Sequence, residues 1–321
     1  MTTNWQSNCS LTALTERANL YHTIRTFFAQ KGVLEVETPL LSSAAATDVH
    51  LSSVSATRHL YGQIQTHYLQ TSPEFAMKRL VANGSGAIYQ ICKVFRDDEH
   101  GHKHNSEFTM LEWYRPHFSL DDLMQETAEL VNACLGQNLT FEQKSYKGVF
   151  LEKLNINPMT ADCQTLKYIT QNLGLTLDLG DDRLAYLDLI FSHAIEPYLG
   201  VDKPLFLKDF PAELASLAKT HSDSDGDVVA SRFELYIDGV ELANAYDELA
   251  DADVLRARMV ADNAERAALG KGAMPIDEHL LTALPKLPPC AGIALGVDRL
   301  LMIKMGTRHI GDVVSFLADR A

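Results

Sequence analysis

The stretch TSPEFAMKRLVANGSGAIYQICKVFRDDEHGHKHNSEFTMLEWY, residues 71–114, determines the fold that we predict for this chain. Two runs within it, 88–95 and 108–114, have the alternating apolar pattern of strands, in which successive side chains point to opposite faces. A long polar segment, 97–106, separates the two runs. We therefore predict a hairpin with a mobile, charged loop. Arg96 lies at the mouth of that loop, where a strand can direct a guanidinium towards a phosphate.

Composition is typical of a globular protein with an acidic surface. The chain has 321 residues, of which 46% are hydrophobic and 22% are charged, with a formal net charge of −14 and a pI near 5.3. This length allows one large domain or two small ones. Binding along nucleic acid is disfavoured, because phosphate neutralisation needs clustered Lys and Arg and the chain has no run of five basic residues.

Cysteine usage and the N-terminus both suggest an intracellular protein. The five cysteines are scattered and form no CxxC pair, which favours reduced thiols over a disulfide framework or a zinc site. The first residues, MTTNWQSNCS, lack the apolar core of a signal peptide, and no run approaches the length of a membrane span. We therefore expect a soluble, cytoplasmic protein.

The N-terminal region is predicted to be a helix followed by a short strand. Ser10 is a typical N-cap and Gly32 is typical of the position just past a helix end. Residues 32–41, GVLEVETPLL, then form a strand that stops at Pro39, because proline cannot donate to a sheet ladder. Such an end can mark a sheet edge or an interface, or can be a simple strand end.

Helical spacing dominates the middle of the chain. We predict helices at 120–135, 160–173 and 181–198, and expect the last two to form a helical insertion around residues 151–200. The remaining expected elements are a strand at 204–211, a flexible acidic loop at 221–227 and a helix at 251–269. No linker forces a division, so we expect a single domain.

The segment RFELYIDGVELANA, residues 232–245, predicts a second hairpin. Asp238-Gly239 between apolar runs is a strong two-residue turn signal. With that turn, Glu234 and Glu241 share one face as diagonal neighbours, opposite an apolar face. Two close carboxylates repel unless a cation lies between them, and Mg²⁺ carrying a polyphosphate is a good candidate. A solvated face with lysine partners explains the pattern equally well.

The segment CAGIALGVDRLLMIKMG, residues 290–306, predicts a strand, a glycine turn and a helix. Gly292 and Gly296 allow a ligand to approach the backbone closely. Arg299 lies on the first helical turn, where it can meet a terminal phosphate.

These regions together resemble the catalytic domain of class II aminoacyl-tRNA synthetases. GVLEVETPLL resembles motif 1, VFRDDE and HNSEFTMLEWY together resemble motif 2, and GIALGVDRL resembles motif 3. Within the class, TSPEFAMKRL and ELANAYDEL are similar to lysyl-tRNA synthetases. The resemblance extends from about residue 15 to 318. It implies an α+β fold with a central antiparallel sheet flanked by helices, and a homodimer formed through the motif 1 segment.

Lysyl-tRNA synthetases carry an anticodon-binding domain before the catalytic domain, and we expect none here because the first catalytic helix starts near residue 11. The chain is thus similar to a family of free-standing ligases that activate (R)-β-lysine or lysine with ATP and transfer it to a lysine side chain of elongation factor P. That similarity implies an AMP-forming amino acid–protein ligase that uses Mg²⁺ and binds neither tRNA nor membranes. A truncated lysyl-tRNA synthetase and a non-catalytic regulatory paralogue remain open as alternatives.

The resemblance assigns nucleotide-binding roles residue by residue. Arg96 would hold the α-phosphate and Arg299 the γ-phosphate, and both are the expected catalytic residues. Glu234 and Glu241 would bind Mg²⁺. The other residues expected around ATP are Asp97, Asp98, His104, Asn105, Leu242 and Gly296. Asp98 stands where the family has a glutamate that contacts adenine, and the adjacent glutamate could take its place.

The resemblance also assigns an amino-acid pocket. Its expected lining residues are Ser72, Pro73 and Glu74. Glu74 would meet the amino group near the carboxylate, while Tyr114 and Glu248 would meet the distal ammonium and so reject neutral side chains. Ala294 replaces a glycine that is usual in lysyl-tRNA synthetases, and its methyl group could favour the displaced amino group of a β-amino acid.

Overall fold

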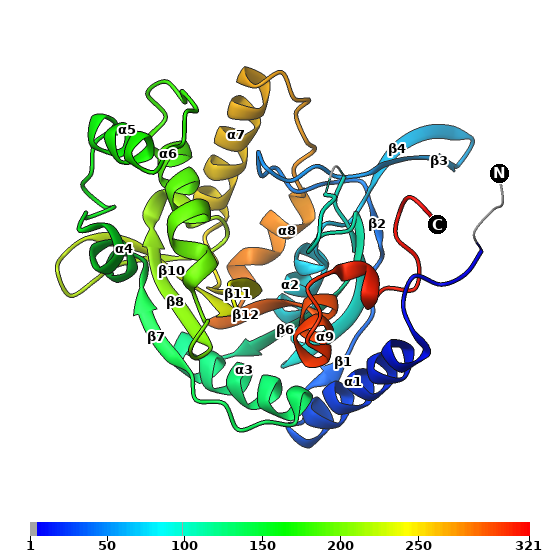
Figure 1. The fold of residues 1–321 in the computed structure, drawn as a ribbon. Coiled ribbons are helices and arrows are strands. Elements are labelled where there is room, and N and C mark those ends of the chain that lie inside the picture. Colours follow the sequence, from blue (N-terminus) through cyan, green and yellow to red (C-terminus); the bar gives the residue numbers. More distant parts are fainter. Residues whose placement is uncertain (1–4, 98) are drawn as a thin grey trace. The chain divides into compact units, whose positions relative to one another are not determined.

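The computed structural model describes residues 5–97 and 99–321. The chain divides into two compact units, one formed by Met1–Gln137 with Asp247–Ala321 and the other by Asn138–Tyr246. Figure 1 shows their helices and strands. Both units combine sheet and helix, which gives the α+β class that the sequence predicts.

The main sheet of the first unit is built from four strands in the order β1, β5, β6 and β12. Their bounds are Leu34–Glu35 (β1), Ile88–Phe95 (β5), Glu107–Pro116 (β6) and Cys290–Gly296 (β12). β6 is antiparallel to β5 and to β12, whereas the short β1 runs parallel to β5. The predicted antiparallel hairpin is therefore confirmed, and β5 has the predicted bounds.

A second, three-stranded sheet of this unit has the order β2, β4 and β3. Its strands are Leu41–Ser42 (β2), Ser55–Leu60 (β3) and Gln63–Leu69 (β4). Sequence reasoning did not identify this sheet. β3 and β4 are mostly polar, and most of their residues are exposed or only partly buried, so they lack the apolar alternation that marks a half-buried strand.

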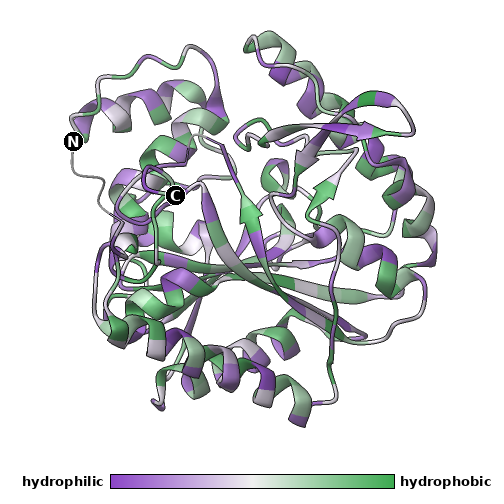
Figure 2. Cartoon of the chain, turned by 90° about the vertical axis from the view of Figure 1, so that its right-hand side faces the viewer, coloured by the Kyte–Doolittle hydropathy of each residue, from purple (hydrophilic) through white to green (hydrophobic). Residues whose placement is uncertain are grey.

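Six helices are described in the first unit. They are Leu11–Gln30 (α1), Glu74–Ala82 (α2), Leu120–Leu135 (α3), Ala252–Ala268 (α7), Glu278–Ala283 (α8) and Val297–Met305 (α9). Figure 2 shows hydrophobic and hydrophilic segments alternating along the helices, as expected for helices with one buried face. α1, α3 and α9 pack on one another, and α2 packs on α8.

The predicted ends of α1 are confirmed. Ser10 Oγ accepts a hydrogen bond from the backbone of Ala13 at 3.1 Å, and Gly32 follows the helix with a φ of +66°. Inside the unit, Phe28 of α1 stacks on Tyr89 of β5 with ring centroids 4.4 Å apart. This contact fixes α1 against β5.

The second unit contains strands in the order β11, β10, β8 and β7, with β9 paired to β10. Their bounds are Glu142–Ser145 (β7), Leu205–Pro211 (β8), Thr220–Ser222 (β9), Val228–Ile237 (β10) and Val240–Asp247 (β11). β7 and β8 are parallel, and the remaining pairs are antiparallel. The prediction of a loop at 221–227 is partly wrong, because β10 supplies a pairing partner for His221 and Ser222.

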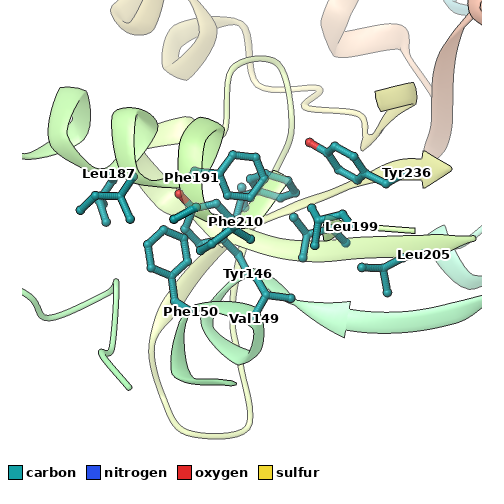
Figure 3. Close-up of a cluster of buried hydrophobic side chains, with 14 of the residues drawn as sticks. Tyr146, Val149, Phe150, Leu187, Phe191, Leu199, Leu205, Phe210 and Tyr236 are labelled. Atoms are coloured by element: carbon teal, nitrogen blue, oxygen red, sulfur yellow. The ribbon is translucent and has the colours of Figure 1, made fainter. Parts of the chain in front are cut away.

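Helices Tyr146–Leu154 (α4), Cys163–Asn172 (α5) and Arg183–Ile190 (α6) complete the second unit. The predicted helix at 181–198 ends early as an α-helix, since residues 191–195 form a π-turn and 196–198 a 3₁₀ turn. Aromatic side chains fill the core of this unit, including Tyr146, Phe150, Phe191 and Phe210 (Figure 3).

Among the described residues, no helix is long and apolar enough to cross a membrane.

Candidate active site

The antiparallel register of β5, β6 and β12 builds a polar floor in the first unit. Glu112 of β6 lies opposite Gln90 on β5 and Ala294 on β12, and Tyr114 lies opposite Gly292 in the next row. Residues in register across a sheet share a face, so these side chains line one surface. Two of the predicted substrate residues, Tyr114 and Ala294, are thereby brought together.

Glu112 is the centre of this floor, and sequence reasoning missed it. Its carboxylate accepts hydrogen bonds from Ser72 Oγ at 2.6 Å and from the Tyr114 hydroxyl at 2.7 Å, and the residue is 2% exposed. Burial, and then the charge of Glu74, raises the pKa of Glu112 to about 8. The sequence could have indicated Glu112 as a site residue, because it lies two positions before Tyr114 and therefore on the same face of the predicted strand.

A buried ion pair lies beside this floor. Lys78 Nζ lies 2.6 Å from Oε2 of Glu248 and 3.4 Å from Oε2 of Glu74, and the side chains of Lys78 and Glu248 are each 1% exposed. Burial raises the pKa of Glu248 to about 7 despite the opposing effect of Lys78. Burial lowers the pKa of Lys78, but Glu248 and Glu74 outweigh it, so that pKa is raised. Lys78 is a second residue that sequence reasoning did not single out.

Glycine at position 292 makes this arrangement possible. A Cβ there would lie 2.3 Å from Oε1 of Glu248 and 2.5 Å from Cε1 of Tyr114, distances that no real side chain tolerates. The predicted trio Ser72, Pro73 and Glu74 also lines a cavity of about 180 Å³, whose other lining residues include Pro39, residues 41–42, residues 44–46 and Asp277. Tyr114, Glu248 and Ala294 do not line that cavity.

Both predicted phosphate-binding arginines are anchored at the same end of β6. The guanidinium of Arg96 lies 5.2 Å from the ring centroid of Phe108, and its Nη1 is 3.3 Å from Glu99. Thr109, which follows Phe108 on β6, donates its backbone N–H to the carboxylate of Asp298 at 2.6 Å. Asp298 immediately precedes Arg299 in the chain. Asp298 also forms a buried ion pair with Arg17 of α1.

The loop between β5 and β6 contacts the motif 3 helix. Nη2 of Arg299 lies 2.7 Å from Nε2 of His104. Asn105, by contrast, is 5% exposed and bonded within the protein, since it donates to the backbone oxygen of Glu107 and accepts from the backbone of Ala318. The N–H of Asp97 donates to the oxygen of Ser52. The predicted adenine contact Asp98 lies outside the described residues.

In the second unit, the Asp238-Gly239 turn forms as predicted, with φ values of +52° and +67°. Glu241 lies opposite Tyr236, which places Glu234 and Glu241 on one face as diagonal neighbours. The register skips Leu242, a residue predicted to lie near ATP, so a bulge interrupts the alternation of side chains along β11.

The solvated-face explanation does not hold for Glu234, which is 8% exposed. It forms an ion pair with Arg232 and accepts a hydrogen bond from Tyr236 at 2.5 Å. Burial raises the pKa of Glu234 to about 7, with a further increase from Glu241 and an opposing effect of Arg232.

The hairpin residues fit a magnesium ion. Within 5–97 and 99–321, no three His, Cys, Asp or Glu side chains gather as a metal-binding group. Magnesium that accompanies a nucleotide needs only one or two carboxylates, because phosphates and water supply the other ligands. Opposite Glu234, the buried Oδ1 of Asn244 has no hydrogen-bond donor among the described residues. This face therefore offers two carboxylates and one unsatisfied oxygen.

The comparisons with known proteins agree with this geometry. The family model for class II tRNA synthetases (D, K and N) matches residues 4–320, and the chain belongs to that family. The chain is similar to the elongation factor P–(R)-β-lysine ligase of Pectobacterium atrosepticum, with 46% identity over 100% of the chain and 99% of the relative. Proteins of the same name from Edwardsiella ictaluri and Salmonella typhi are each 45% identical, covering 99% and 100% of the chain and 98% and 99% of the relatives. The predicted family resemblance is thus confirmed.

Proposed function

We propose that the chain activates (R)-β-lysine or lysine with ATP as an acyl-adenylate and transfers the acyl group to a lysine side chain of elongation factor P. The supporting observation is the charge of the pocket. Glu74, Glu112 and Glu248 surround a single ammonium, that of Lys78. With all three carboxylates ionised, they carry two negative charges more than Lys78 balances, and burial together with this excess keeps a proton on Glu112 up to about pH 8 when no amino acid is bound. The two ammonium groups of a diamino acid would neutralise the excess and favour the ionised form of Glu112.

The first step makes and breaks bonds at the α-phosphorus. An oxygen of the substrate carboxylate forms a bond to this phosphorus, and the bond to pyrophosphate breaks. Arg96 is the candidate for binding the α-phosphate and Arg299 for the γ-phosphate, so that both stabilise the charge that develops in the transition state. Gly296, Asp97, His104, Asn105 and Leu242 are the other residues that we propose around the nucleotide.

Glu234 and Glu241 would hold Mg²⁺, which neutralises phosphate charge when it is bound. In the second step, the amine of the acceptor lysine attacks the acyl carbon and AMP leaves. The chemistry needs no covalent enzyme intermediate. We further propose that both compact units belong to one catalytic domain that acts as a cytoplasmic homodimer.

The pocket proposal is tested by ATP–pyrophosphate exchange with (R)-β-lysine, lysine and norleucine. Exchange should require a diamino acid, because norleucine lacks the distal ammonium and leaves Lys78 as the one cation beside Glu74, Glu112 and Glu248. Equal exchange with norleucine would refute the assignment of the pocket. Absence of exchange with every amino acid would favour a non-catalytic paralogue.

The acceptor is tested by intact-mass measurement of elongation factor P after incubation with ATP and each lysine isomer. A mass increase of one lysyl residue on a lysine side chain supports the proposal. Because the family also contains tRNA synthetases, bulk tRNA is the necessary parallel acceptor. Charging of tRNA without modification of elongation factor P would identify a tRNA synthetase instead.

A further inference from the structure

The β3–β4 hairpin carries exposed apolar side chains at its tip. The strands are joined by Tyr61-Gly62, with φ values of +50° and +78°. Tyr61 is 95% exposed and Ile64 is 71% exposed. β3 is the outermost strand of its sheet, and Figure 1 shows β3 and β4 as a long curved ribbon. An edge strand with exposed apolar residues can pair with another chain, so proteins normally cover such a surface or protect it with charged residues.

The charge of this region differs from that of the rest of the chain. Acidic residues make up 42 of 321 positions, yet none occurs between residues 49 and 73. On β3 the exposed side chains include Arg58 and His59, and no carboxylate lies on either strand. In a chain of net charge −14, this hairpin therefore presents a neutral to basic surface, which favours a partner with an acidic face.

The base of the hairpin is bonded to the backbone on both sides of Arg96. Phe95 donates its N–H to the oxygen of Gln70 at 2.9 Å, and Asp97 donates to the oxygen of Ser52 at 2.8 Å. Six residues of strand span about 20 Å from base to tip, at roughly 3.3 Å per residue. The hairpin is thus fixed at its base beside the proposed reaction centre. Its tip, about 20 Å away, can contact a macromolecular acceptor but not a small free amine bound at that centre.

We infer that the β3–β4 hairpin docks the protein acceptor. Tyr61 and Ile64 contact the acceptor together with His59, which lies opposite Ile64 in the register, and Arg58, on the other face of the ribbon, adds positive charge that attracts an acidic partner. The inference rests on the proposed function, since it requires that the acceptor be a protein. The link to both sides of Arg96 favours the acceptor over a second copy of the chain. An acceptor lysine must be brought to the activated acyl group, so a docking surface anchored beside Arg96 would help to position it. A contact between two copies of the chain has no such need to be anchored beside Arg96.

The experiment separates activation from transfer. The variants are Tyr61→Ser/Ile64→Ser, Arg58→Glu and the control Tyr168→Ser, whose tyrosine is 65% exposed on α5. Diamino-acid-dependent pyrophosphate exchange should remain within twofold of wild type in all three. The KM for elongation factor P should rise about tenfold or more in the hairpin variants only, as expected when a contact worth about 1.4 kcal/mol is lost.

Each alternative outcome contradicts the inference in a distinct way. Wild-type exchange without transfer to elongation factor P would mean that the proposed acceptor is wrong, and the inference would fail with it. Wild-type transfer with an unchanged KM in the hairpin variants would overturn the inference alone. Conversion of a dimer to a monomer in sedimentation, with loss of exchange, would show that the hairpin joins two copies of the chain.

Discussion

Nζ of Lys78 and Oε2 of Glu248 are 2.6 Å apart, with 1% of each side chain exposed. Burying two charges is costly, and their mutual attraction offsets that cost only while both partners are present. Lys78 also lies 3.4 Å from Glu74, so one ammonium holds two pocket carboxylates in place. Contacts within the protein therefore already hold these carboxylates, which we propose to be part of the amino-acid pocket.

Replacing Lys78 by methionine keeps the length of the side chain but removes its charge. We expect Lys78→Met to lower the free energy of unfolding by about 3–5 kcal/mol, because Glu248 becomes a buried carboxylate without a cation. The double variant Lys78→Met/Glu248→Gln should recover part of this loss. Urea denaturation of the single and double variants measures both effects. A single variant as stable as wild type would show that the ion pair contributes nothing.

The raised pKa of Glu112 predicts how stability depends on pH. The folded protein holds a proton on this carboxyl up to about pH 8, whereas the unfolded chain loses it near its ordinary value of 4.5. The folded state thus binds more protons between these values, and the free energy of unfolding should fall as pH rises through that window, by about 1.4 kcal/mol per pH unit at most for one group. Glu248, with a pKa near 7, acts in the same direction.

Glu112→Gln should flatten the upper part of this decline, from about pH 7 to 8, because the amide does not titrate. The measurement is thermal or urea unfolding of the protein without amino acid at several pH values. Glu142→Gln, an exposed carboxylate in the second unit, is the control and should leave the profile unchanged. An unaltered profile in Glu112→Gln would contradict the assignment of the shift to this residue.

Two glycines of β12 should respond differently to alanine. Gly292→Ala places a methyl group within 2.5 Å of Glu248 and Tyr114, so we expect the KM for the diamino acid in pyrophosphate exchange to rise about tenfold or more. Gly296→Ala meets nothing closer than 3.6 Å, the Cδ of Arg299. The main effect of Gly296→Ala should be a higher KM for ATP. A raised KM for ATP in Gly292→Ala, with a raised KM for the diamino acid in Gly296→Ala, would contradict the proposed roles of the two glycines.

Arg299→Ala should lower kcat for exchange about 10²-fold, because a positioned cation that stabilises developing charge is removed. Arg256→Ala is the matched control. Its partner Glu278 and its own side chain are both largely exposed, and such surface pairs contribute about 0–1 kcal/mol. If kcat at saturating ATP changed little in Arg299→Ala, the residue would contribute to ATP binding and not to stabilising the transition state.

Sequence reasoning succeeded where one face of an element is buried. The ends of α3 and β5 match because apolar spacing and capping residues coincide there. It failed at the β3–β4 hairpin, whose polar strands are held by backbone hydrogen bonds that leave no hydrophobic pattern. Glu112 and Lys78 were missed for a related reason. Ser72 bonds to Glu112 and Glu248 pairs with Lys78, and both of these partners are distant in the chain, so only the fold brings them together.

The irregularity at Leu242 has a consequence for comparing related chains. Glu241 and Asn244 are three positions apart, a spacing that in a flat strand would send their side chains in opposite directions, yet their pairing with Tyr236 and Glu234 orients both the same way. Deleting or inserting one residue in this strand would change which oxygens face the proposed magnesium site while leaving the hydrophobic composition intact. Aligning homologues by alternation alone would therefore select the wrong candidate ligands.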